Sequence, residues 1–137
     1  MTPEDLKGRT KVFALRVITL VDAMPRTQAG QTIGRQLLRS PTSVGANYRA
    51  AWRAPSRAEF AAKISIVVEE ADETLYRLEL LEESGLIASE RLAQLLREAN
   101  ELVAIAVSSR KTAKGKADSE GRLCSAIGNR QSRIDNP

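Results

Sequence analysis

The stretch RSPTSVGANYRAAWR, residues 39–53, decides how the fold of this chain is interpreted. Pro41 would normally interrupt an α-helix, because proline has no backbone N–H and its ring clashes with the preceding turn. At about 100° per residue, however, an apolar stripe keeps its phase on both sides of the proline: Ile33, Leu37, Val44, Tyr48 and Ala51. We therefore predict one helix with a kink at Pro41. The alternative is that Ser40 caps a new helix whose first residue is Pro41.

Three further segments place apolar residues at helical spacing. They span about residues 3–24, 56–85 and 89–110. The second of these begins with Ser56 and Glu59 in a Ser-x-x-Glu capping box, which predicts a helix start. Nowhere do apolar and polar residues alternate for long enough to predict a strand. The sequence therefore predicts an all-α protein, an antiparallel four-helix bundle with a kinked second helix.

The length and composition predict one domain followed by a tail. With 137 residues the chain can build a single modest core. We assign residues 1–111 to the bundle and residues 112–137 to a basic tail, which is polar and is predicted to be disordered. The chain's only cysteine, Cys124, lies in this tail, so no intrachain disulfide is expected. The longest apolar run, LVAIAV at 102–107, is far too short to cross a membrane, and we expect a cytoplasmic protein.

Several kinds of chemistry are disfavoured by the residues that the sequence lacks. There is no histidine, the side chain most used for proton transfer near neutral pH and the commonest metal ligand. Four acids cluster in the third helical segment, but three of them are predicted to point outward, and Glu70 is predicted to flank the core: Glu69, Glu70, Asp72 and Glu73. We therefore predict no catalytic residue, no metal site and no cofactor, and a protein that is not an enzyme.

Charge is strongly segregated along the chain. Residues 7–57 hold ten basic residues and one acid, whereas residues 59–101 hold eleven acids and four basic residues. Opposite the apolar stripe of the second helix lies a basic stripe: Arg35, Arg39, Arg49 and Arg53. Guanidinium groups suit phosphate, so this stripe predicts an RNA or DNA contact. Two alternatives are a contact with the acidic third helix of a neighbouring subunit and a solvated face.

Two further groups of residues are candidates for binding. Trp52 adjoins Arg49 and Arg53 and could stack a base, or it could seal the edge of the bundle; Tyr48 falls in the core stripe. On the third helix, a mixed apolar and acidic stripe is predicted to face away from the core: Ile66, Glu69, Glu73, Tyr76 and Leu80. We interpret this stripe as a subunit contact.

Two long segments carry a family resemblance. SVGANYRAAWRA (43–54) and SRAEFAAKISIVVEEADETLYRLELLEESG (56–85) resemble the four-helix-bundle proteins encoded in intervening sequences of large-subunit ribosomal RNA genes, and the resemblance covers about residues 5–114. That family is similar in fold to accessory proteins of diversity-generating retroelements. The resemblance implies a cyclic homopentamer, nucleic-acid binding and a possible reverse transcriptase partner, and it implies no enzymatic activity.

These observations lead to one preferred function and one alternative. We predict a homo-oligomeric bundle that binds RNA or DNA through the arginine stripe, as an accessory to a reverse transcriptase or a ribosomal RNA element. The alternative is a structural or protein-interaction module whose charged faces serve assembly and a protein partner.

Overall fold

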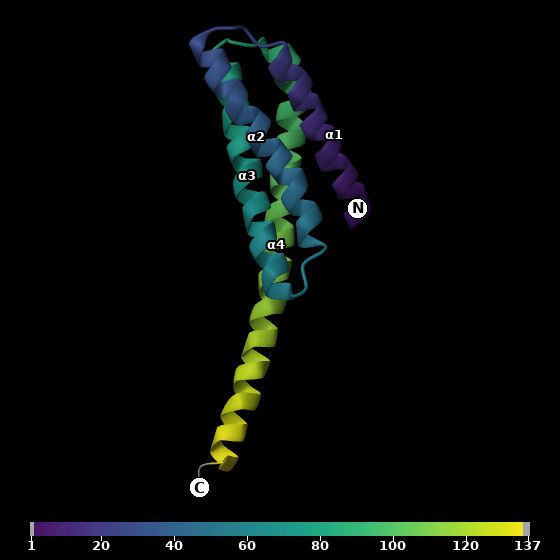
Figure 1. Cartoon of the computed structure of the whole chain (residues 1–137), viewed down its shortest axis with the longest axis vertical. Helices are drawn as coiled ribbons and strands as arrows, with labels where there is room; N and C mark the ends of the chain where they lie inside the picture. Colours follow the sequence, from purple (N-terminus) through teal and green to yellow (C-terminus); the bar gives the residue numbers. More distant parts are fainter. Residues whose placement is uncertain (1, 136–137) are drawn as a thin grey trace.

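The computed structural model describes the backbone of residues 2–135 and the side chains of residues 2–115. These residues form four helices: α1 (Pro3–Asp22), α2 (Gln28–Ala51), α3 (Arg57–Glu83) and α4 (Ser89–Asp135). Consecutive helices run antiparallel, and each packs along the next one in the chain (Figure 1). α1 makes its main contact with α2 and a much smaller one with α4. The predicted all-α four-helix bundle is confirmed.

α2 is a single helix that contains Pro41, which confirms the prediction of continuity and excludes a new helix start at that residue. The apolar stripe keeps its phase, because Leu37 and Val44 on either side of the proline are both buried. Hydroxyl groups beside the proline donate to nearby carbonyl oxygens, Ser40 Oγ to Gln36 O at 3.0 Å and Thr42 Oγ1 to Leu38 O at 2.7 Å. The kink at Pro41 stays a prediction.

The other helix starts and turns follow from local chemistry. Ser56 Oγ accepts a hydrogen bond from the Glu59 amide at 3.1 Å, which confirms the predicted start of α3. The turn between α1 and α2 needs glycine at position 30, since a Cβ there would lie 2.3 Å from the Pro25 carbonyl oxygen. Gly85 ends the α3 segment with a φ of 74°, a left-handed conformation that glycine adopts without strain.

The core runs the length of the bundle and draws on all four helices. Its fully buried side chains include Val17 of α1, Leu37 of α2, Leu78 of α3 and Leu92 of α4. Buried apolar area of this kind is the main stabilising contribution in a bundle of this size. The core side of every predicted amphipathic segment is therefore the side that the structure buries.

The predicted boundary at residue 112 falls inside a helix. α4 runs through it, and Ala113 is still buried against the bundle. Thr112 donates from its hydroxyl to Ser108 O at 3.1 Å, as helical residues four apart often do. For residues 112–115 the structure thus differs from the predicted disordered tail, because α4 continues through them and Ala113 still packs on the bundle. The backbone of residues 116–135 also continues as α4, whereas residues 136 and 137 and the environment of Cys124 lie outside what the structure describes.

Candidate nucleic-acid interface

The predicted arginine stripe lies on the outer side of α2 and beyond its end, but its members have different surroundings. Arg35, Arg39, Arg49 and Arg53 are all exposed. Among residues 2–115, Arg35, Arg49 and Arg53 have no acidic partner within 4.0 Å. Arg39 instead lies 3.7 Å from Glu70 Oε1 and 3.8 Å from Glu73 Oε2, both on α3 of the same chain. The structure therefore divides the stripe into one exposed arginine that lies near two acids and three exposed arginines without an acidic partner within 4.0 Å among residues 2–115.

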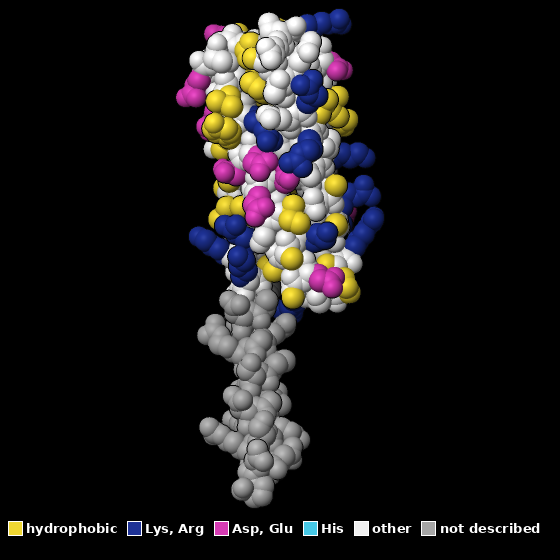
Figure 2. All heavy atoms as spheres, turned by 60° about the vertical axis from the view of Figure 1, so that its left-hand side comes forward, with side chains coloured by type: hydrophobic (Ala, Val, Ile, Leu, Met, Phe, Trp, Pro, Cys, Tyr) yellow, Lys and Arg dark blue, Asp and Glu magenta, His cyan; other side chains and the backbone are white. Residues whose placement is uncertain are grey.

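Arg39 belongs to a polar network between α2 and α3. Arg77 of α3 donates to Ser40 Oγ at 2.9 Å and lies 3.5 Å from Glu73 Oε2. Ser40 is fully buried, and the Arg77 side chain is only 16% exposed. A buried hydroxyl needs a hydrogen-bond partner, so this network stabilises the close packing of the two helices. In Figure 2 acidic side chains gather at mid-height on one face, with basic side chains beside and below them.

A similar network joins α1 to α4. Arg9 donates to Glu98 Oε2 at 3.0 Å and also contacts Glu101. The hydrogen bonds that Arg9 donates to Glu98 raise the pKa of Arg9, and the partial burial of the guanidinium opposes this shift. This arginine stabilises the smallest interhelical contact of the bundle, and the sequence analysis did not single it out. No local sequence pattern indicates these ion pairs, because Arg9 and its two acidic partners are about ninety residues apart in the chain.

The predicted acidic and apolar stripe of α3 is only partly free. Tyr76 is 60% exposed, Glu69 is exposed, and Ile66 and Leu80 are half-buried. Glu73, by contrast, lies beside Arg39 and Arg77 within the chain. The outward position of Glu69, Asp72 and Glu73 is confirmed, as is the flanking position of Glu70, whose side chain is 13% exposed.

The aromatic side chains at the end of α2 form a short row. Tyr48 is buried, as predicted for a core residue, and burial raises the pKa of its hydroxyl. Trp52 is 46% exposed and meets Tyr48 edge-on, with ring centres 6.4 Å apart. Phe60 of α3 meets Trp52 at 4.9 Å and 71°. Trp52 therefore does cover the bundle edge, and it also exposes nearly half of its surface.

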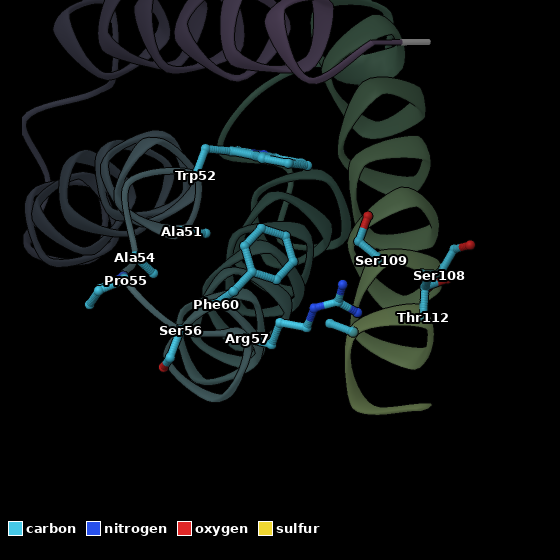
Figure 3. Close-up of a pocket in the computed structure, with 11 residues that line it drawn as sticks. Ala51, Trp52, Ala54, Pro55, Ser56, Arg57, Phe60, Ser108, Ser109 and Thr112 are labelled. Atoms are coloured by element: carbon cyan, nitrogen blue, oxygen red, sulfur yellow. The ribbon is translucent and has the colours of Figure 1, made fainter. Parts of the chain in front are cut away.

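A cavity beside Trp52 brings in residues that the sequence analysis missed. Its lining includes Arg57 and Phe60 of α3 and Ser108 and Ser109 of α4 (Figure 3). The chain reversal signalled by the capping box at Ser56 could have placed Phe60 near Trp52. No local pattern could have placed residues 108 and 109 there, because their approach depends on how α4 packs.

Comparisons with known proteins agree with this architecture. The model of the 23S rRNA-intervening sequence protein family matches residues 5–108. This chain belongs to that family. A crystal structure at 1.70 Å of a protein of unknown function from the S23 ribosomal protein family of Bacteroides thetaiotaomicron VPI-5482 is similar in fold and sequence. It is 35% identical, with a TM-score of 0.74 over 81% of this chain and 99% of that one. A search of curated proteins finds no significant match.

Membership of the intervening sequence family accounts for the four-helix architecture and leaves the chemistry to the individual residues. The matched region ends at residue 108, so the family model includes α1 to α3 and only the first part of α4. The matched region contains Trp52, Phe60 and the three arginines that have no acidic partner within 4.0 Å among residues 2–115. Within the described part of the chain, no helix of this family member is long and apolar enough to span a membrane.

Proposed function

We propose that this protein is a non-enzymatic, self-associating bundle that binds RNA or DNA through exposed arginines of α2 and the turn that follows it. The observation that carries the proposal is the exposure of Arg35, Arg49 and Arg53, none with an acidic partner within 4.0 Å among residues 2–115. Phosphate groups would supply the missing counter-charge, and planar guanidinium groups match their geometry. Arg39 contributes less, because Glu70 and Glu73 already offset its charge.

Self-association would strengthen such binding. The family resemblance supports a cyclic assembly of five subunits that acts as an accessory to a reverse transcriptase or a ribosomal RNA element, and we propose that this assembly works in the cytoplasm. The exposed Tyr76 and half-buried Leu80 of α3 suit a subunit contact. A ring would repeat the same three arginines on every subunit, and this repetition raises affinity without any new contact.

A second candidate function is a protein-interaction module. It is favoured by the 60% exposure of Tyr76 on an acidic helix, since exposed aromatic residues are enriched in protein contacts. In this case the three arginines would meet acids of a neighbouring subunit or of a different protein. The two functions predict different effects on binding and on assembly when these arginines are replaced with an uncharged residue.

The test is the salt dependence of binding to a single-stranded RNA and to a DNA duplex. Replacing Arg49 and Arg53 with Gln together should remove two phosphate contacts per engaged subunit. The slope of log K against log salt should then flatten by about 1.4 to 1.8, because each contact contributes about 0.7 to 0.9. Arg39→Gln is the matched control and should change the slope by much less, since this arginine is neutralised within the chain.

Sedimentation of the same variants separates the two candidates. Under the nucleic-acid function, the double variant keeps the sedimentation coefficient of the wild type. The opposite result has two parts: the wild type shows no salt-sensitive binding to RNA or DNA, and the double variant forms a smaller assembly. In that case these arginines belong to the protein contact.

A further inference from the structure

The cavity beside Trp52 lies at the end of the bundle where α2 ends and α3 begins. Its volume is about 560 Å³, within the range of small-molecule sites. Trp52 forms one wall, Phe60 and Arg57 extend from α3, and Ser108, Ser109 and Thr112 line the side formed by α4 (Figure 3). Three helices therefore contribute aromatic, cationic and hydroxyl groups to a single hollow.

The indole of Trp52 has room for a stacked partner. Tyr48 and Phe60 meet it at interplanar angles of 72° and 71°, so neither ring lies parallel on it. The side chain remains 46% exposed after these contacts are made. A planar ring entering the cavity could therefore stack on the indole, as bases do on aromatic side chains of single-strand-binding proteins.

The side opposite Trp52 offers hydrogen-bond acceptors. Ser109 Oγ donates its proton to Ile105 O at 2.9 Å, and Thr112 Oγ1 donates to Ser108 O at 3.1 Å. Each hydroxyl oxygen still has lone pairs that can accept a hydrogen bond. The exocyclic amino groups of adenine, cytosine and guanine are donors, so this wall suits the edge of a base.

Basic residues dominate the surrounding chain. Residues 49–63 contain four basic residues and one acid, Glu59, and residues 104–115 contain three basic residues and no acid. Both segments contribute lining residues to the cavity. Arg57 is the basic residue of the lining, and the net positive charge of the two segments around the cavity is complementary to the phosphates beside a base. An acidic peptide would match the charge alone and would leave the indole without a stacking partner.

We propose that this cavity binds one unstacked base of a single-stranded nucleic acid, with Trp52 as the stacking platform and the adjacent phosphates on the basic rim. The inference rests on the proposed nucleic-acid function and adds a site that selects single strands over duplexes. A duplex keeps its bases stacked on one another, and an unstacked base is what the cavity can receive.

The experiment uses Trp52 as its own reporter, because it is the chain's single tryptophan. Intrinsic fluorescence is followed while the full chain is titrated with oligoadenylate, with an abasic oligonucleotide of equal phosphate number, and with adenosine monophosphate. We expect oligoadenylate to quench the emission and to bind more tightly than the abasic strand. Adenosine monophosphate should quench it more weakly, because it has one phosphate.

Three variants identify the role of the ring. With labelled oligoadenylate, Trp52→Leu should weaken binding by about 5- to 100-fold, the range for loss of one stacked base. Trp52→Phe should retain binding within about threefold of wild type, and neither change should affect the abasic strand. Ser109→Phe fills the cavity from α4 and should abolish quenching while Trp52 remains. This variant decides the question if Trp52→Leu does not fold by circular dichroism.

Each other outcome has a defined meaning. Equal binding of the abasic strand and oligoadenylate, without quenching, would overturn the base site and leave the proposed function intact. Quenching by adenosine monophosphate without binding of any oligonucleotide would support the base site and overturn the nucleic-acid function. Absence of binding by all three probes would overturn both. Polyglutamate that quenches as strongly as oligoadenylate would overturn the base site, because charge alone would then explain the effect.

Discussion

The middle of α2, around Arg39, and the region around its end place arginine in different surroundings. Arg39, just before Pro41, lies beside two acids of α3. Arg49 and Arg53 have no acidic partner within 4.0 Å among the described residues. The difference comes from the antiparallel packing of α3, which sets its acid-rich middle beside Arg39 in the middle of α2 and its basic beginning against the end of α2. The role of an arginine therefore depends on the register of the neighbouring helix as well as on its own position.

The largest effect should come from breaking the packing that sets this register. Leu37 is fully buried beside the polar network, and Leu37→Ala should lower the free energy of unfolding by about 2–5 kcal/mol. Urea unfolding followed by circular dichroism measures this loss. Leu38→Ala is the matched control, because Leu38 is 37% exposed and should lose far less. Equal losses would show that α2 does not bury this face.

A smaller effect should come from the network itself. Arg77→Met keeps the aliphatic stem and removes the guanidinium that donates to the buried Ser40 and lies beside Glu73. The expected cost is about 1–3 kcal/mol, the range for a buried polar group left without its partner. Arg49→Met serves as the control and should change stability by no more than about 0.5 kcal/mol. A similar loss of unfolding free energy in both variants would show that the network at the middle of α2 stabilises the protein no more than the exposed Arg49 does.

The smallest effect concerns Asp5, an exposed carboxylate at the start of α1, which gives a baseline for charge at the surface. The Thr2 amide donates to Asp5 Oδ2 at 3.0 Å, and this hydrogen bond lowers the pKa of Asp5 below its usual 3.8. Because the folded-state pKa is the lower one, its stabilisation is present at neutral pH. It is lost as the pH falls through the folded-state value.

Asp5→Asn should therefore make the unfolding midpoint slightly less sensitive to acid. The measurement is urea unfolding of wild type and variant at several pH values between about 5 and 2, where this carboxyl titrates. A steeper acid response in the variant would contradict the assigned direction of the shift.

Much of the fold could be predicted because it depends on local periodicity. The phase of Leu37 and Val44 across Pro41 identified one continuous helix, and the capping residue Ser56 identified the start of α3. The difference at residues 112–115 has the opposite cause: the apolar pattern fades there, but packing still buries Ala113. Periodicity detects a helix through its apolar face, so a stretch of helix with mostly small and polar residues escapes it.

The candidate site was less predictable because its parts come from different helices. The exposure of all four arginines followed from the phase of α2, but the neutralisation of Arg39 required the register of α3. Trp52 was identified as a candidate for stacking from its neighbours in sequence. The opposite wall of its cavity, formed by Ser108 and Ser109, is more than fifty residues away along the chain.

The packing order of the helices also has a consequence for folding kinetics. Each helix packs mainly on the next one along the chain, so most interhelical contacts can form by closing one short turn. Chains with such local contacts fold rapidly. The small contact between α1 and α4 is the exception, since it closes a loop of almost the whole bundle; it includes the ion pairs of Arg9 with Glu98 and Glu101. We expect this contact to form last during folding and to open first in amide hydrogen exchange.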